Sequence, residues 1–232
     1  MSNTLTRFRF RCRGSRRGPT SSPRSPQRWV RWTPPSRSAT YQVTFVGFWA
    51  DRYHPNNFPT GARWSPLIGA VHSSRASFWE MGETSSPGME RMAEAGTTGI
   101  LSSEITKEIP HNALSVISAS GGPGWGNRSI PIEVDLDNPL ITLVTKMDPS
   151  PDWFAGVTGL SLLNGVGQWI RERWFYLLPL DAGTDSGASY TAEADDTWPN
   201  EPIHGRSGMA PFSRYLVATV IVTRTDGPGG GG

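Results

Sequence analysis

The chain has one cysteine, no long apolar run and no acidic residue near its beginning, and each absence excludes something. Cys12 has no cysteine partner among the 232 residues, so no disulfide can form within the chain. The fold must therefore be stabilised by its core and by any ion that it binds. No stretch of about 20 apolar residues occurs, so no membrane-spanning helix is predicted. Residues 1–40 also lack the apolar stretch of about 7–15 residues found in a secretory signal peptide.

The net charge of +2 conceals an asymmetry between two parts of the chain. Residues 1–40 contain ten arginines and no acidic residue, whereas residues 41–232 contain 12 Lys and Arg against 20 Asp and Glu, a balance of −8. The first segment is rich in Arg, Ser and Pro, and we expect a disordered leader; residues 226–232 are expected to be a flexible, glycine-rich tail. The acidic balance argues against nucleic-acid binding by the folded part. An alternative kept open is that the arginines of the leader bind an anionic polymer.

The composition and the hydrophobic pattern predict a β protein. The chain has 26 Gly, 20 Pro and only 18% charged residues, which favours a turn-rich β fold over a helical bundle. Segments with the composition or alternation of strands are residues 41–49, 75–81, 114–119, 130–136, 139–147, 154–163, 168–178 and 215–225. Turn-forming residues lie between them, so we predict an all-β antiparallel sandwich of about eight strands.

Finer features predict where some of these segments lie. Pro131 interrupts the alternating segment 130–136, which indicates an edge strand, and residues 215–225 are apolar on both faces, which indicates a central strand. Most of the ten tryptophans are expected in the core.

One or two short helices are expected beside the strands. Pro87 follows two serines, as at many helix starts, and Met89 and Met92 share one face before Gly96 ends the segment. A second helical stretch is predicted for residues 100–109.

Three aspartates stand out between residues 149 and 187. Asp152 lies in PSPDWF, and Asp181 and Asp185 lie in LPLDAGTDSG. Loop carboxylates at strand ends can hold Ca²⁺, which takes about 6–8 oxygen ligands and tolerates irregular geometry. The spacing is not that of an EF-hand loop. The alternative is that these aspartates only form turns, because Asp side chains accept hydrogen bonds from nearby backbone N–H groups.

Four blocks of the chain resemble the spondin domain family. They are YQVTFVGFWADRYHPNNFP (residues 41–59), RWSPLIGAVHSSRASFWEMG (63–82), PSPDWFAGVTGLSLLNG (149–165) and LLPLDAGTDSGASYTA (177–192). The pairing of PSPDWF with a downstream DAGTDSG is the most specific of these matches. On this resemblance the domain is expected to span residues 41–225.

The resemblance implies a fold, an ion and a class of partner. It implies a β-sandwich related in shape to C2 domains, with a calcium ion held at one end by Asp152, Asp181 and Asp185. It also implies a secreted, extracellular protein that attaches to matrix, cell-surface receptors or glycans. The chain departs from animal members, which carry cysteines around residues 160–165 and are usually followed by thrombospondin repeats. We therefore expect a stand-alone copy without the animal-type disulfides.

Catalysis and zinc binding are weighed against this interpretation. Asp181 and Asp185 are a conceivable carboxylate pair for a sandwich-type hydrolase acting on polysaccharide. A carboxylate bound to calcium is a poor general acid, however, and no nucleophile with its base can be identified, so no enzymatic activity is predicted. The histidines are His54, His72, His111 and His204, and no two of them have a zinc-ligand spacing on one element.

Overall fold

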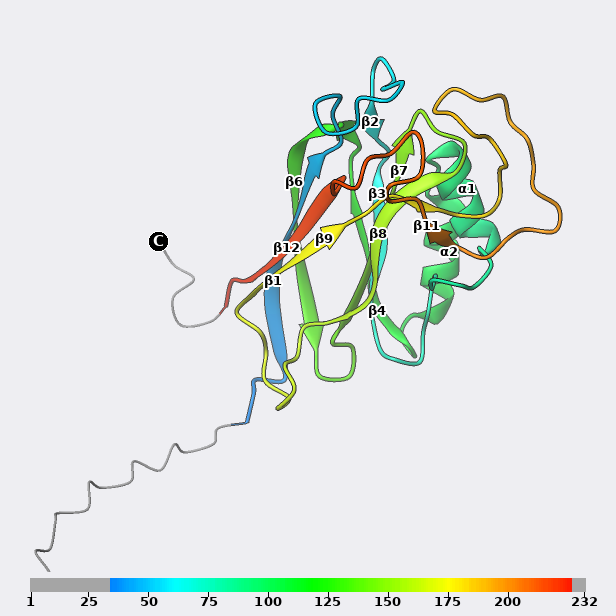
Figure 1. Cartoon of the computed structure of the whole chain (residues 1–232). Helices are drawn as coiled ribbons and strands as arrows, with labels where there is room; N and C mark the ends of the chain where they lie inside the picture. The colour runs from blue at the N-terminus through cyan, green and yellow to red at the C-terminus, as the bar shows by residue number, and fades with distance from the viewer. Residues whose placement is uncertain (1–33, 227–232) are drawn as a thin grey trace, which may run out of the picture. The chain divides into compact units, whose positions relative to one another are not determined.

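The computed structural model describes residues 34–226, and these form a sandwich of two antiparallel β-sheets (Figure 1). The first sheet has four strands in the order β6-β1-β12-β9. Their bounds are β1 (Ser38–Phe48), β6 (Trp125–Asp135), β9 (Glu172–Leu177) and β12 (Ala218–Arg224). We call it the four-stranded sheet.

The second sheet has eight strands, four of which contain only two residues. Six follow the order β11-β10-β8-β7-β2-β5, and β3 pairs with both β7 and β4. The bounds are β2 (Arg63–Trp64), β3 (Leu67–His72), β4 (Ala113–Ala119), β5 (Gly122–Pro123), β7 (Leu140–Asp148), β8 (Trp153–Ser161), β10 (Leu180–Asp181) and β11 (His204–Gly205). The prediction of an all-β sandwich is confirmed, and eight strands in the two sheets have six residues or more.

The core between the sheets follows from alternation along the strands. In β1 the side chains of Tyr41, Val43 and Phe45 are buried, while the residues between them are more exposed. Among residues 34–226, five of the eight tryptophans are at most 7% exposed, which agrees with the expected core role. The three exposed ones are Trp125, Trp174 and Trp198.

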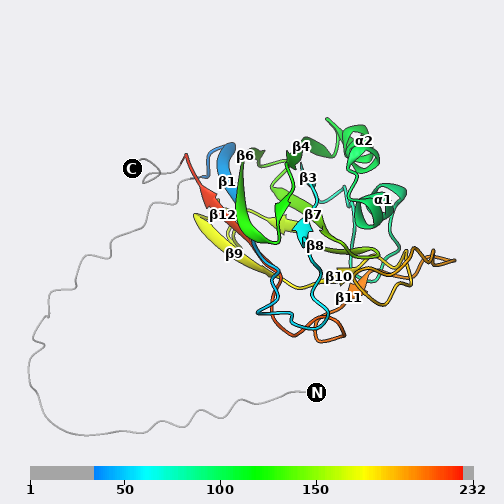
Figure 2. The same cartoon turned by 90° about the horizontal axis from the view of Figure 1, so that it is seen from above.

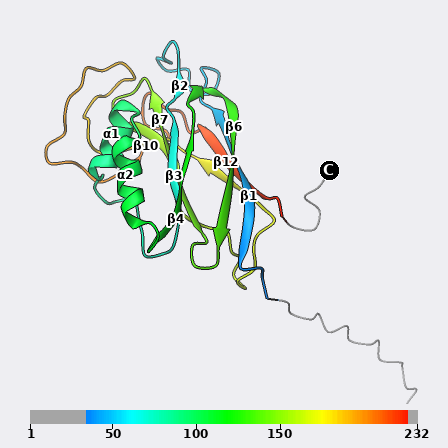
Figure 3. The ribbon, with the colours of Figure 1, turned by 180° about the vertical axis from the view of Figure 1, so that it is seen from behind.

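Two helices cover the outer face of the eight-stranded sheet. Helices α1 (Pro87–Ala95) and α2 (Gly99–Glu108) lie against β3, β4 and β7 (Figures 2 and 3). Met89 and Met92 join a second core cluster with Val144 and Phe154 of the sheet. Strand β7 is therefore buried on both faces, whereas no described helix covers the outer face of the four-stranded sheet.

Several finer predictions are confirmed. Helix α1 begins after Ser86, whose Oγ accepts a hydrogen bond from the Met89 N–H, and it ends at Gly96 in the left-handed conformation with φ 67°. Strand β6, which contains Pro131, is an edge strand. Strand β12 is central, between β1 and β9.

The strand expected at residues 75–81 is wrong. This segment forms turns, and the strand of this region is β3. The neighbouring side chains of Phe78 and Trp79 both pack against the second core cluster, whereas successive residues of a strand point to opposite faces. The aromatic composition therefore reflects packing against the outside of the sheet. The other seven expected strands are present.

The first strand begins before the boundary expected at Tyr41. Strand β1 starts at Ser38, Ala39 is 1% exposed, and the Trp169 indole N–H donates to the Ser36 carbonyl over 2.8 Å. The predictions of a disordered leader and a flexible tail fall mainly on residues 1–33 and 227–232, which lie outside the described residues.

The Glu104 carboxylate should contribute to stability because it caps the neighbouring helix. It accepts hydrogen bonds from the Gly88 N–H (2.8 Å) and the Ser86 hydroxyl (2.7 Å) at the start of α1, where a negative charge also complements the helix dipole. We expect Glu104→Ala to lower the free energy of unfolding by about 1–2 kcal/mol in urea titrations. Glu104→Gln retains an acceptor oxygen and should lose less. Equal stability of Glu104→Ala and the unchanged chain would contradict this role.

Candidate metal centre

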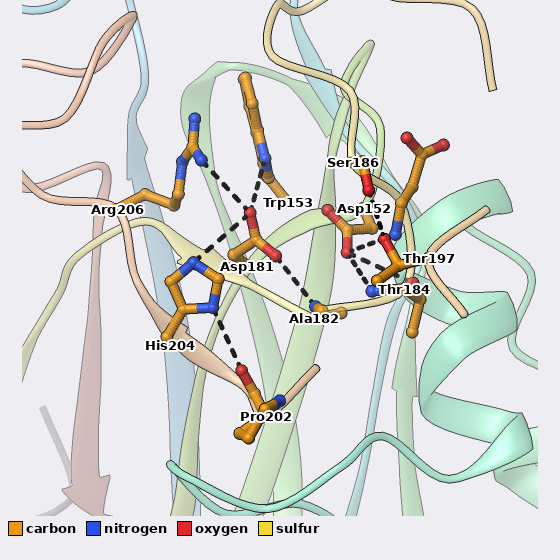
Figure 4. Close-up of polar contacts among 12 residues, drawn as sticks. Asp152, Trp153, Asp181, Ala182, Thr184, Ser186, Thr197, Pro202, His204 and Arg206 are labelled. Atoms are coloured by element: carbon orange, nitrogen blue, oxygen red, sulfur yellow. Dashed lines mark hydrogen bonds and ion pairs between the residues drawn. The ribbon is translucent and has the colours of Figure 1, made fainter. Parts of the chain in front are cut away.

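Two of the three predicted aspartates, Asp152 and Asp181, lie side by side at one end of the eight-stranded sheet (Figure 4). Asp152 directly precedes β8, Asp181 ends β10, and Asp185 lies in the loop that follows β10. Strands β8 and β10 are paired so that Asp181 is opposite Trp153. This pairing brings residues separated by 29 positions in the chain into one polar network.

Asp152 is the most deeply buried of the three. Its side chain is 0% exposed, and its Oδ2 accepts hydrogen bonds from the backbone N–H groups of Thr184 (2.8 Å) and Asp185 (3.2 Å). The Thr184 hydroxyl lies 3.3 Å from the same oxygen. The other oxygen, Oδ1, is buried and has no hydrogen-bond partner among the described residues. One carboxylate oxygen therefore organises the loop, and the other is unsatisfied.

The environment of Asp152 opposes its negative charge. Burial raises its pKa to about 6, the charge of Asp181 and, more weakly, that of Asp185 act in the same direction, and the two backbone N–H groups oppose them. Between pH about 4 and 6 the folded chain thus retains a proton that the unfolded chain has lost. The contribution of this group to stability therefore falls as the pH rises through that window.

Both carboxylate oxygens of Asp181 accept hydrogen bonds. Oδ1 accepts from the Gly183 N–H (2.9 Å), and Oδ2 accepts from the Trp153 indole N–H (3.2 Å). Arg206 Nη1 lies 3.5 Å from Oδ2, and His204 Nε2 lies 3.9 Å from it (Figure 4). The Arg206 guanidinium also sits 4.7 Å from the centre of the Trp153 ring.

Asp185 connects the centre to a second loop segment. Its Oδ1 accepts from the Gly187 N–H (2.8 Å), and its backbone pairs with Asp196 in an isolated bridge. Backbone bonds join Ser186 N–H to the Asp195 carbonyl (2.8 Å) and Thr197 N–H to the Thr184 carbonyl (2.9 Å). A cavity of about 240 Å³ opens here, lined by Asp181, Asp185, Glu201, His204 and Arg206 among others.

The donor set fits a hard cation in composition, although the side chains do not converge. Among residues 34–226, no three Asp, Glu, His or Cys side chains are close enough together to hold a metal ion as they stand. The carboxylates of the three aspartates offer only oxygen ligands, which Ca²⁺ prefers. The buried Oδ1 of Asp152 accepts no hydrogen bond from any described residue. The predicted aspartates lie in one region of the fold without converging on a common point, and their role as ligands stays a prediction.

Buried Lys146 supports the loop that carries Asp152. It is 3% exposed, and its Nζ donates to the carbonyls of Ala93 (2.8 Å), Ser150 and Pro151 (3.0 Å). Burial lowers the pKa of Lys146 to about 8, although several surrounding carboxylates act in the opposite direction. The lysine therefore fixes residues 150–151 against the end of α1.

Sequence reasoning missed most partners of the aspartates. Thr184 and Lys146 carried no recognisable signal in the sequence. The two-residue spacing of His204 and Arg206, at and just after β11, could have indicated that both side chains face the same way. His72 is held by hydrogen bonds within the fold. Its ring nitrogens lie 2.8 Å from the Ser73 carbonyl and 2.8 Å from the Thr142 hydroxyl.

Comparison with known proteins gives consistent matches over the described fold. The Spondin_N family model matches residues 39–214. Spondin-2 of Rattus norvegicus is 36% identical over 179 residues, which cover 75% of this chain and 54% of the relative. Spondin-1 of Gallus gallus is 33% identical over 205 residues, which cover 81% of this chain and 25% of the relative. The chain thus spans about half the length of the spondin-2 relative and about a quarter of spondin-1.

In the described part of the chain, no helix has both the length and the apolar character needed to cross a membrane.

Replacing Lys146 should test whether it stabilises the loop that carries Asp152. Lys146→Met leaves three carbonyls without their donor, so we expect the free energy of unfolding to fall by about 3 kcal/mol at pH 7 in urea titrations. Lys107, the only other lysine of the chain, is exposed, and Lys107→Met should leave the stability within about 0.5 kcal/mol.

The pH dependence provides a second measurement on the same variants. Between pH about 8 and the ordinary lysine pKa of 10.5, the unfolded chain holds the proton and the folded chain has lost it. The unchanged chain should therefore gain stability relative to Lys146→Met as the pH rises from 8 to 10. A difference that is constant or shrinks over this range would show that the lysine is not desolvated as described.

Proposed function

Because this chain belongs to the Spondin_N family, we propose that it is a calcium-binding recognition module that works outside the cell. In this proposal it attaches to matrix, cell-surface receptor or glycan ligands. The chain spans only about half of the spondin-2 relative, so the proposal concerns the module and not the complete activity of any relative.

One observation supports the calcium site above all others. A carboxylate oxygen of Asp152 is buried without a donor, while Asp181 and Asp185 add negative charge to the same region. Removing an ionised carboxylate from water is strongly unfavourable unless it is paired. A divalent cation would supply the missing charge, with Asp152, Asp181 and Asp185 as its side-chain ligands and backbone carbonyls or water providing further oxygens.

The proposed ion would join segments that are distant in sequence. Asp152 directly precedes β8, Asp181 belongs to β10, and Asp185 belongs to the loop paired with residues 195–197. An ion held by all three would restrain this loop pair against the sheet. Its role would then be to fix the shape of the end of the sandwich, which could present a binding face.

No observation favours the hydrolase alternative. Asp152, whose pKa burial raises to about 6, is 0% exposed and therefore inaccessible to a polysaccharide. Asp181 is engaged by Trp153 and Arg206, which leaves it poorly placed to transfer a proton. The anionic-polymer alternative depends on arginines that lie mainly in residues 1–33, outside the described residues, and it stays a prediction.

Calcium should stabilise the folded chain and chelation should reverse the effect. At a hundredfold excess of free Ca²⁺ over Kd, mass action adds about 2.7 kcal/mol, so the Tm should rise measurably in differential scanning calorimetry and fall with EDTA. A glycan and matrix-protein array probed with and without the ion would test the recognition role. Unchanged melting curves in Ca²⁺ and EDTA would refute a calcium-bound native state.

Asp152→Asn should separate ion binding from stability. The variant keeps an acceptor for the Thr184 and Asp185 N–H groups and loses a buried charge, so its ion-free stability at pH 7.5 should not fall below that of the unchanged chain. Its Tm should no longer respond to Ca²⁺. The matched control is Asp195→Asn, which removes an exposed charge from the paired loop and should retain the response. Loss of the response in both variants would indicate general charge binding only.

A further inference from the structure

The uncovered face of the four-stranded sheet carries large aromatic side chains. Trp125 on β6 is 48% exposed, and Trp174 and Tyr176 on β9 are 53% and 69% exposed. Tyr215, just before β12, is 61% exposed. The opposite sheet is covered by helices, so the two outer faces of the sandwich differ in kind (Figure 2). Clustered exposed aromatic groups are typical of interaction sites.

A groove of about 230 Å³ lies at one end of this face, separate from the aspartates. It is lined by Phe48, Tyr53, Tyr215 and Leu216. The rings of Tyr53 and Tyr215 are 5.5 Å apart with an interplanar angle of 49°. Beyond Tyr53, the Trp125 ring lies nearly parallel to it, with centroids 6.2 Å apart. We call this groove and the adjoining Trp125 ring the aromatic groove.

A single hydroxyl holds both tyrosines in place. The Ser213 Oγ donates to the Tyr53 carbonyl (2.6 Å) and accepts from the Tyr215 N–H (3.1 Å). The Ser213 N–H in turn donates to Nδ1 of His54, which is fully buried (3.3 Å). The backbone of both tyrosines is thus anchored to the interior. A groove that is already ordered loses less conformational entropy when a ligand binds.

The rim of the aromatic groove carries a positive charge. The guanidinium carbon of Arg52 lies 3.8 Å from the Trp125 ring centre and 4.8 Å from that of Tyr53. The six ion pairs found among residues 34–226 do not include Arg52. The carboxylate of neighbouring Asp51 instead accepts the backbone N–H of Arg52 (2.7 Å). The guanidinium is thereby left to attract an anionic group.

We propose that the aromatic groove binds acidic sugar units of a glycan. The apolar C–H face of a pyranose ring complements the negative π face of an aromatic ring, and a sugar carboxylate or sulfate complements Arg52. The phenol oxygens of Tyr53 and Tyr215 make no hydrogen bond within residues 34–226, so they are available to sugar hydroxyls. The inference rests on the proposed recognition function, since it selects the glycan among the proposed ligands.

The charge distribution favours an acidic glycan over a nucleic acid. Stacking on aromatic rings and pairing with arginine also suit RNA, but a polyphosphate requires many cations along its path. Residues 41–232 carry a charge balance of −8, and the groove has one arginine at its rim. A sparsely charged polymer with apolar sugar faces matches this composition better.

The test compares glycan binding by paired variants of the full-length chain. Dissociation constants for hyaluronan oligosaccharides and for neutral dextran are measured by affinity electrophoresis, with heparin as the sulfated probe. Tyr215→Ala should weaken hyaluronan binding on the order of tenfold, whereas Tyr176→Ala, an exposed tyrosine of the same face outside the groove, should not. Arg52→Ala should weaken it more than Arg75→Ala, which removes an equal charge elsewhere on the surface.

Several results would overturn the inference. The first is an equal affinity for hyaluronan in Tyr215→Ala and Tyr176→Ala, or in Arg52→Ala and Arg75→Ala. The second is binding of dextran as strong as that of hyaluronan. The third is binding of an RNA homopolymer that depends on Tyr215 while hyaluronan does not bind. A change of oligomeric state in Tyr215→Ala without loss of glycan binding would assign the groove to contacts between copies. The Tm response to Ca²⁺, measured on the same Tyr215→Ala protein, should persist. Its absence from the unchanged chain would refute the calcium proposal independently of the groove.

Discussion

The end of the sandwich that carries the aspartates depends on the burial of one carboxylate, that of Asp152. Its Oδ2 accepts the backbone N–H groups of Thr184 and Asp185 and so determines the path of the loop after β10. That loop pairs with residues 195–197, and Asp181 at the end of β10 holds Arg206 and the Trp153 indole nearby. The same burial raises the pKa of Asp152 to about 6. The group that organises this end is therefore also the group whose charge is least compensated, because its second oxygen has no partner among the described residues.

The two outer faces of the sandwich explain how the chain can separate structural from binding surfaces. On the eight-stranded sheet, α1 and α2 bury the outer face with Met89, Met92 and their neighbours, and β7 is buried on both sides. On the four-stranded sheet, strand alternation places polar groups such as Thr44 and Ser129 on the outer face, which also carries exposed aromatic residues. Large aromatic residues on a solvent-exposed sheet face contribute little to the core. Their presence is more readily explained by contact with a partner than by stability.

How far the sequence predicts this molecule depends on whether the signal is local. Alternation in β1 and β6, the proline in β6, and the serine and glycine at the ends of α1 are local features, and the corresponding elements are present. The strand predicted at residues 75–81 is wrong because Phe78 and Trp79 pack against the outside of the eight-stranded sheet. Their aromatic character thus reflects tertiary packing and not strand formation. At the candidate metal centre, the turn-forming neighbours of Asp152, Asp181 and Asp185 identify the aspartates. The contacts of Arg206 and Lys146 depend on strand pairing and on the position of α1, which no short pattern encodes.

Lys146 shows why this end of the sandwich is electrostatically unbalanced even though it contains both signs of charge. Burial shifts the pKa of Lys146 downwards and that of Asp152 upwards, so each group is pushed towards its neutral form. The lysine is satisfied by carbonyls of Ala93, Ser150 and Pro151, and it makes no ion pair with Asp152. Its charge reaches the aspartate only from a distance. A chain that needed Asp152 for loop structure alone would serve equally well with asparagine, which offers the same acceptor without the buried charge. A cation beside the unpaired oxygen would offset this buried charge, which loop structure alone does not require.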